Sequence, residues 1–356
     1  MSSDLRSPPP GSGLLETTEK LRRASLSKAN LEKVVVELQH RLAEKSALLE
    51  ALTGLAEERT VAPIEAAPRK QGALPEGTYV SLLSDAHLDE RVRPVEVRGI
   101  NEYKPEIAHE RMQQFWQKNL LMLQAARKTW EVRTYIQWLG GDLQTGWIHD
   151  ELISENYLSP FEAAEFVYDE VEAGLKFLLD HSDCERIVVA TSNGNHGRNT
   201  DKMWASGAWR NSYEFHIYKF LSKRFADSSR IQFQLGQGYE NHLTVHGLRI
   251  RFHHGDEVKS RGGVGGIYPA LYRRVNEVNS GPDKADLDCF GHHHRLGFAP
   301  RAFGNGSVIG YNHYAATKGF APEEPQQASF VVDSVRQIPA AMWPILVKEP
   351  RRGARK

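Results

Sequence analysis

Five short apolar runs in this chain are each followed, within a few residues, by side chains of the kind that bind metal ions. The runs begin at Tyr79, Tyr135, Ile187, Leu248 and Leu287. Each has the length and composition of a buried strand. Helix-like stretches near 107–130 and 161–179 separate several of them, and strands that alternate with helices predict a layered α/β domain. Runs at 307–311 and 329–333 predict two further strands.

The polar side chains after these runs are carboxylates, amides and imidazoles. In chain order they are Asp85 and His87, Asp142, Asn195 and His196, His253 and His254, and His292 to His294. In open α/β sheets, ligands bind beyond the carboxyl ends of the strands, so the five blocks predict one shared site. Residues i and i+2 of an extended segment face the same way. Asp85 is therefore expected to act with His87, and His292 with His294, while His293 points away.

The mixture of donors predicts two divalent metal ions. It combines oxygen and imidazole donors and has no thiolate, although structural zinc sites usually contain cysteine. Such a set suits manganese, iron, zinc or nickel, and we take manganese as the first choice. There are too many donors for one ion, and paired ions are a common device for displacement reactions at phosphorus.

The five blocks resemble the motifs of the calcineurin-like metallophosphoesterase family, in the family's order: D-x-H, GD, GNH, H and GHxH. Here they read Asp85-x-His87, Gly141-Asp142, Gly194-Asn195-His196, His254 and Gly291-His292-x-His294, over about residues 78–335. The resemblance implies a two-sheet β-sandwich flanked by helices, with the site at one sheet edge. Small departures from the family pattern and the phage-like residues of the blocks suggest a bacteriophage or prophage member.

The resemblance also implies a role for each residue of the blocks. Asp85, His87 and His294 would hold the first metal. Asn195, His254 and His292 would hold the second, and Asp142 would bridge both. His196 would be catalytic, as a general acid or charge stabiliser beside the substrate phosphate. His254 precedes Gly255 as the family requires and is therefore favoured over His253.

One departure from the family pattern concerns the residue after His196. Many members carry an acidic residue there that orients the imidazole, whereas this chain has Gly197. Asp256 is a candidate replacement, with an ordinary surface carboxylate as the alternative. Arg198 and Arg261 are candidates for binding the phosphate, and for Arg261 a flexible surface loop is an equal competitor.

The function that follows is hydrolysis of a phosphate ester by a hydroxide bridging two metals, with Asp142→Asn expected to lower turnover at least a hundredfold. A phosphodiester, in DNA or RNA, is the first hypothesis, because Lys202, Trp204, Trp209 and Arg210 follow the third block. Such residues can clamp a single strand, although tryptophans are more often core. The alternatives are a phosphatase acting on a small molecule or phosphoprotein, favoured by the net charge of +0, and a non-catalytic metal-binding scaffold.

The rest of the chain divides by composition. Residues 1–13 are rich in Ser, Pro and Gly, which predicts disorder. Residues 61–77 are predicted to be a linker, and residues 348–356 a basic tail. The metallophosphoesterase domain is then predicted to span residues 78–347. Residues 14–60 predict a helix whose seam has coiled-coil spacing. Its positions are Leu21, Ala24, Lys28, Leu31, Val35, Leu38, Leu42, Lys45, Leu49 and Leu52. Self-association through this seam is one expectation, and docking on the chain's own domain is the other.

No apolar run approaches the length of about 18 residues that a membrane span requires. The N-terminus has no apolar signal core. The two cysteines, Cys184 and Cys289, each sit in or beside an apolar run, as expected of buried thiols in a reducing compartment. We therefore expect a cytoplasmic protein that does not contact membranes.

Overall fold

The computed structural model describes residues 12–57, 73–204, 206–259 and 266–349, and for residues 12, 13 and 51–57 it gives only the helix to which they belong. The chain divides into two units, Met1–Gln71, whose described residues form one long helix, and Gly72–Lys356, which is called the body below. The segments predicted as disordered, linker and basic tail fall largely outside the described residues. The domain limits therefore stay predictions.

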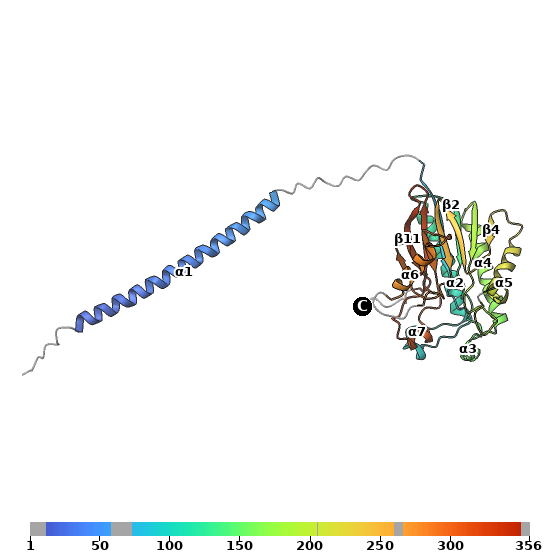
Figure 1. Ribbon diagram of the computed structural model, residues 1–356, viewed down its shortest axis with the longest axis horizontal. Coiled ribbons are helices and arrows are strands. Elements are labelled where there is room, and N and C mark those ends of the chain that lie inside the picture. The colour runs from blue at the N-terminus through green and yellow to red at the C-terminus, as the bar shows by residue number, and fades with distance from the viewer. Residues whose placement is uncertain (1–11, 58–72, 205, 260–265, 350–356) are drawn as a thin grey trace, which may run out of the picture. The chain divides into compact units, whose positions relative to one another are not determined.

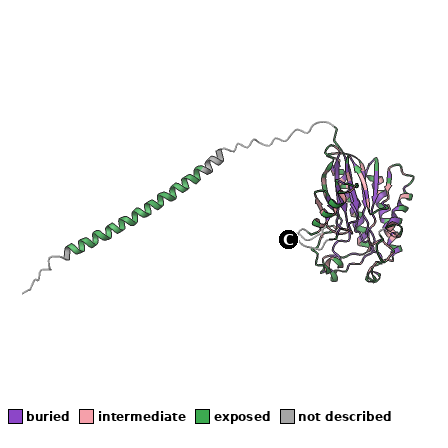
Figure 2. Cartoon of the chain, in the orientation of Figure 1, coloured by how far each residue is buried: buried purple, intermediate pink, exposed green. Residues whose placement is uncertain are grey.

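The N-terminal helix α1 (Ser12–Glu57) is 46 residues long, which confirms the helix predicted before the body. Every described side chain from Leu14 to Glu50 is exposed (Figure 2). Ion pairs one turn apart, such as Glu37 with Arg41 at 2.8 Å, lie along it. Leucines of the predicted seam are exposed as well, so α1 by itself has an apolar stripe.

The body is built around two β-sheets (Figure 1). The larger sheet has the order β11-β10-β1-β2-β3-β4. Its parallel strands are β1 (Glu76–Leu83), β2 (Glu131–Leu139), β3 (Arg186–Thr191) and β4 (Ile231–Gln234), and β10 (Gln326–Asp333) and β11 (Ile338–Leu346) extend it antiparallel. The smaller sheet has the order β5-β6-β7-β9-β8. Its strands are β5 (Glu240–Val245), β6 (Leu248–His253), β7 (Leu287–Phe290), β9 (Ala302–Gly304) and β8 (Gly297–Ala299).

Helices cover the outer faces of both sheets. Over the larger sheet lie α2 (Pro105–Ala126), α4 (Pro160–His181) and α5 (Tyr213–Arg224), and over the smaller sheet lies α6 (Tyr268–Asn279). The connections contain α3 (Asp150–Glu155), α7 (His313–Thr317) and the short helices η1 (Pro94–Val97) and η2 (Ala208–Asn211). Among the described residues no helix combines the length and apolarity needed to cross a bilayer.

Strand β1 shows why the central strands read as continuous apolar runs. Tyr79 and Leu83 pack into the core beneath the helices. Val80 and Leu82 point the opposite way and pack between the two sheets. A strand covered on both faces has no solvent side, and it therefore loses the usual alternation of polar and apolar residues. The predicted two-sheet sandwich flanked by helices is confirmed.

The predicted strand at 307–311 is wrong. Residues Val308 and Ile309 are buried, as an apolar run should be, but they lie in a loop. The main-chain N–H of Val308 donates to the carbonyl oxygen of Asp85 at 3.1 Å, and that of Gly310 to the hydroxyl of Ser307 at 3.1 Å. These bonds tie the segment to the end of β1 instead of to a neighbouring strand.

Candidate metal centre

The strands that carry the predicted ligands end at the same level. Leu83 of β1 pairs with Leu139 of β2, which pairs with Thr191 of β3. In the smaller sheet, His253 of β6 pairs with Phe290 of β7. Every predicted ligand follows one of these strand ends within a few residues. Parallel strands thus deliver side chains far apart in sequence to one edge of the sandwich.

Main-chain hydrogen bonds continue past the strand ends and hold the ligand loops together. Asp85 N–H donates to the carbonyl of Gly141 at 3.0 Å, and His87 N–H to that of Asp142 at 3.1 Å. Gly141 adopts a left-handed φ of 84°, and a Cβ there would overlap the main chain of Gly194. Glycine at position 141 therefore allows the second and third loops to approach closely.

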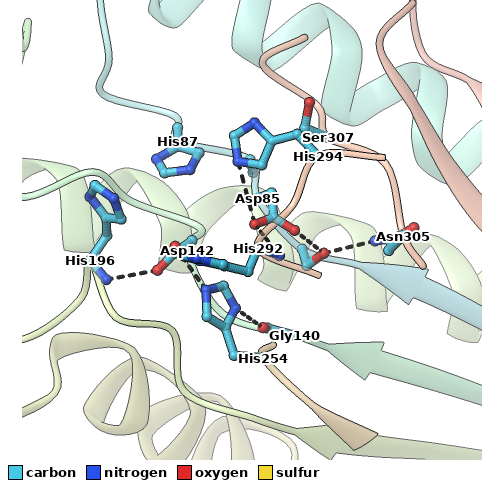
Figure 3. A network of polar contacts seen from close by, with 12 residues as sticks. Asp85, His87, Gly140, Asp142, His196, His254, His292, His294, Asn305 and Ser307 are labelled. Atoms are coloured by element: carbon cyan, nitrogen blue, oxygen red, sulfur yellow. Dashed lines mark hydrogen bonds and ion pairs between the residues drawn. The ribbon is translucent and has the colours of Figure 1, made fainter. Parts of the chain in front are cut away.

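Asp85, His87 and His294 form the first group of side chains with the spacing of metal ligands. The Nε2 atom of His294 is 3.5 Å from Oδ1 of Asp85. The same Oδ1 accepts the main-chain N–H of His292 at 2.8 Å, while the hydroxyl of Ser84 donates to Oδ2 (Figure 3). Asp85 is thus fixed on both oxygens.

Asp142, His254 and His292 form the second group. The Nε2 atom of His254 lies 2.9 Å from Oδ2 of Asp142 (Figure 3). Nδ1 of His254 is 2.8 Å from the carbonyl oxygen of Gly140. A carbonyl only accepts, so Nδ1 carries a proton, and Nε2 is the ring atom that faces Asp142 and would bind a metal. The amide oxygen of Asn195 lies 3.1 Å from the same Nε2 and therefore beside this group.

Five of these side chains sit on left-handed backbone. The φ angles are 54° at Asp85, 48° at His87, 50° at Asp142, 66° at His292 and 52° at His294. Left-handed backbone is uncommon outside glycine and concentrates at functional sites, where the surrounding structure holds it in place. Its repeated occurrence at predicted ligands is an observation independent of the sequence motifs.

The electrostatics of the cluster suit cation binding. Burial lowers the pKa of His87 well below its ordinary value and that of His292 to about 4, so both imidazoles are neutral at pH 7. Burial alone would raise the pKa of Asp142, but the facing imidazoles of His254 and His196 hold it well below its ordinary range. Against the effect of burial, the neighbouring carboxylates raise the pKa of His254 well above its ordinary value and also raise that of His294. Carboxylate and imidazole side chains gathered in this way are the donor chemistry of divalent transition metals.

Exposure differs across the cluster. Asp85, His87, Asp142 and His254 are buried, whereas Asn195, His196, His292 and His294 are half-buried. A solvent-borne ligand can therefore reach the cluster only past the half-buried members.

His196 lies beside the cluster and is held by the loop that follows Asp142. Its Nδ1 donates to the carbonyl of Thr145 at 3.0 Å, and its main-chain N–H donates to Oδ1 of Asp142 at 2.8 Å. Its ring meets that of His87 edge-on, with centroids 5.0 Å apart. Asp256 does not orient it, because Asp256 accepts the hydroxyl of Tyr239 at 2.6 Å instead. Thr145 therefore fills the orienting role proposed for Asp256.

Of the two arginines predicted to bind the phosphate, the structure describes only Arg198. Arg198 donates to the main-chain carbonyls of Asn195, Thr200 and Asp201 at 2.5, 2.9 and 3.3 Å. These bonds engage three of the five N–H donors of its guanidinium, so binding a phosphate there stays a prediction. Arg261 lies outside the described residues.

His253 belongs to a different network from His254. Its Nε2 is 3.4 Å from Asp288, and its Nδ1 is 3.1 Å from Glu257. Asp288 in turn accepts two bonds from Arg251, at 2.6 and 3.0 Å. Sequence reasoning missed this network because Arg251, His253 and Asp288 are single polar residues within strands.

Sequence reasoning also missed the residues that hold the ligands. Asn305 donates to the hydroxyl of Ser84 at 2.9 Å (Figure 3). Asp89 accepts the main-chain N–H of Thr145 at 2.6 Å and that of Gly146 at 3.1 Å. Asp89 lies two residues after His87, so its place in the sequence could have indicated a supporting role. Nothing in the sequence near Asn305 indicated one.

No protein-family model and no curated protein matches the chain. Among solved structures, it is similar to Vps29 from Entamoeba histolytica, described as complexed with zinc, at 11% identity and a TM-score of 0.30, over 75% of this chain and 99% of that one. It is similar to Vacuolar Protein Sorting 29 from Cryptosporidium parvum at 12% identity and a TM-score of 0.31, over 72% and 86%. A predicted phosphoesterase from Streptococcus pneumoniae gives 12% and 0.27, over 72% and 84%. These scores are too low to support a conclusion about function.

Proposed function

We propose that this chain is a dinuclear metal-dependent phosphoesterase that hydrolyses a phosphodiester. The observation that carries the proposal is the pair of adjacent ligand groups, Asp85 with His87 and His294, and Asp142 with His254 and His292. Asn195 would complete the second group, and Asp142 would bridge the two ions. Mn²⁺ is the first choice, with iron, zinc and nickel as the alternatives that the same donors accept.

The chemistry that two divalent ions supply when bound is activation of a water and neutralisation of phosphate charge. The chain's own residues do the rest. Asp142 holds its carboxylate between His254 and the main chain of His196. His196, fixed by Thr145, is the residue that would protonate or hydrogen-bond the leaving oxygen. The ester would approach over the half-buried side chains of the cluster.

A nucleic-acid diester is the favoured substrate. Trp204 is 54% exposed on the segment that follows His196 and Arg198. An exposed indole near a phosphate site can stack on a base. Trp209, in contrast, packs on Phe215 with ring centroids 4.7 Å apart and is not free to stack. The alternative substrates are a phosphomonoester on a small molecule or on a protein.

The test uses the full chain, stripped of metal and refilled with Mn²⁺. We would compare hydrolysis of bis-p-nitrophenyl phosphate and p-nitrophenyl phosphate, with Asp142→Asn as the matched control. The expected result is metal-dependent diester cleavage that falls at least a hundredfold in Asp142→Asn. Turnover retained within about tenfold in that variant would overturn the role of Asp142.

Two further outcomes decide between the alternatives. A preference for the monoester would move the assignment to a phosphatase. Bound Mn²⁺ with no cleavage of either ester would favour a metal-binding scaffold. If the diester is cleaved, Trp204→Ala should weaken cleavage of single-stranded DNA or RNA and leave the small ester unaffected.

We also propose that α1 self-associates through its seam. Leu31, Leu38 and Leu42 are 62, 59 and 67% exposed, and apolar residues at alternating spacings of three and four bury each other in a coiled coil. Light scattering should show an oligomer that Leu38→Glu dissociates and that Val36→Glu, off the seam, leaves intact. A monomeric wild-type chain would exclude self-association.

A further inference from the structure

Glu214 is a buried carboxylate that the proposed chemistry does not use. It is the second residue of α5 and has 0% exposure. Its Oε1 accepts the main-chain N–H of Leu143 at 2.7 Å, and its Oε2 accepts that of Gly194 at 2.7 Å. Both oxygens are therefore bonded to main chain, and each bond goes to a different loop.

These two N–H groups flank two of the predicted ligands. Leu143 directly follows Asp142, and Gly194 directly precedes Asn195. Main-chain donors next to a ligand fix where that ligand's side chain starts. One carboxylate that binds both donors thus sets the distance between the loop of Asp142 and the loop of Asn195.

The space that Glu214 fills lies against Gly197. A Cβ built on Gly197 would lie 2.7 Å from Cγ and 2.9 Å from Cδ of Glu214. Gly197 is not among the glycines of left-handed φ, and the three atoms nearest to a Cβ built there all belong to Glu214. A short acidic side chain at position 197 would begin where the carboxylate of Glu214 now lies.

A buried carboxylate is costly unless it is paired or well hydrogen-bonded. In the parts of the chain that the structure describes, no Lys, Arg or His forms an ion pair with Glu214 within 4.0 Å, so its bonds are to main chain alone. An apolar residue of similar volume would avoid the cost but would accept neither N–H group. A glutamine would accept one of them and place its NH₂, which only donates, against the other. The demand for two acceptors explains a glutamate here.

We propose that Glu214 is a positioning residue for the second ligand group, acting from α5 through the N–H groups of Leu143 and Gly194. The proposal rests on the proposed function in that Asp142 and Asn195 are taken to share a divalent ion. Both hydrogen bonds of Glu214 go to main chain and neither goes to the side chain of a proposed ligand. Its removal should weaken the second metal site more than the first, because Asp142 would serve both ions but Asn195 only the second, whereas a general loss of folding would weaken both sites alike.

The test is calorimetric titration of the metal-free full chain with Mn²⁺, a readout independent of turnover. The wild type should bind two ions. Removing residues that orient metal ligands typically costs 10–100-fold in affinity. Glu214→Ala should therefore weaken the second site, which would hold both Asp142 and Asn195, at least tenfold, and should weaken the first site less. Glu214→Gln, which keeps the volume and loses one acceptor, should weaken the same site.

A relocated carboxylate gives the sharpest comparison. Gly197→Asp alone should weaken the site, because its Cβ would collide with Glu214. The double variant Gly197→Asp with Glu214→Ala should restore affinity to within threefold of the wild type. Glu170→Gln, at a carboxylate of α4 that pairs with His109 at 2.5 Å, is the matched control and should bind as the wild type does.

Each contrary result has a distinct meaning. Two unaltered Mn²⁺ sites in both Glu214→Ala and Glu214→Gln would overturn the positioning role while leaving the proposed function intact. If circular dichroism shows that the double variant is folded but its Mn²⁺ affinity does not recover, the positioning role is overturned too. A wild type that binds fewer than two ions would overturn the proposed function, and the role of Glu214 with it. If Glu214→Ala does not fold, Glu214→Gln and the double variant decide.

Discussion

The Nδ1 atom of His196 donates to the carbonyl oxygen of Thr145 across 3.0 Å. This bond fixes the ring plane and assigns the proton of the neutral imidazole to Nδ1, so that Nε2 is the ring atom that remains for a substrate. The main-chain N–H of His196 is engaged separately, with Oδ1 of Asp142 at 2.8 Å. The side chain and the main chain of His196 therefore serve different parts of the site.

His196→Ala should separate catalysis from metal binding. The variant loses the imidazole but keeps the main-chain bond to Asp142. We expect kcat to fall by about a hundredfold, the usual contribution of a positioned acid or base, with Mn²⁺ affinity within threefold of the wild type. Steady-state kinetics and calorimetry on the same preparation measure both, and a parallel loss of affinity would show that His196 acts mainly by holding the loop.

Removing the metal should destabilise the body. Asp85 and Asp142 are 0% and 1% exposed and lie in close-packed groups of donors. An ion that binds only the folded state adds about 2.7 kcal/mol at a free concentration a hundred times its dissociation constant. The melting temperature should fall when EDTA is added and return with Mn²⁺. Asp142→Asn should show a smaller response, and an equal response in the two proteins would contradict the assigned ligands.

Gly174→Ala should destabilise the protein, against the usual preference of helices for alanine. Gly174 lies in α4, where a Cβ would overlap the indole of Trp116 on α2. Overpacking of this kind typically costs about 1–3 kcal/mol. Urea denaturation measures the loss, and Gly174→Ala combined with Trp116→Leu should recover part of it. A stabilised single variant would mean that the indole moves aside without cost.

Glu257 should make stability fall as pH rises. Burial raises its pKa from 4.5 to about 7, so the native state holds a proton that the unfolded chain releases. Its contribution to stability is complete below about pH 4.5 and is lost as the pH rises through about 7. At roughly 1.4 kcal/mol per unit of pKa, the loss is about 1–3 kcal/mol.

Comparison with Glu257→Gln isolates this effect. Unfolding free energies of the metal-free proteins at pH 5 and pH 8 should show the wild type losing stability relative to the variant. The same pH dependence in both proteins would assign the titration to another group.

The sequence predicted the buried parts of the sandwich better than its edges. Strands β1, β2, β3, β6 and β7 follow apolar runs that are covered on both faces. Strand β4 is a short edge strand that alternates polar and apolar residues, and β11 is exposed at every second position and contains two prolines. An edge strand has less surface to bury, so its composition resembles that of a loop.

The ligand blocks were predictable because each one is local, with its residues adjacent or two apart after a strand. The supporting residues were not. Glu214 reaches Gly194 from 20 positions away and Leu143 from 71. Asn305 reaches Ser84 from 221 positions away. Contacts of this separation depend on how the sheets pack, which no short window of sequence contains.

The bond between the main chain of His292 and the carboxylate of Asp85 joins positions 207 apart. Contacts that close so long a segment carry a large entropic cost and tend to form late in folding. Both ligand groups draw on β-strands of the larger and the smaller sheet. The centre therefore assembles only when the two sheets have docked. During synthesis, a ribosome-bound chain that lacks β7 has neither group complete, so ion capture would mark the end of folding and not its beginning.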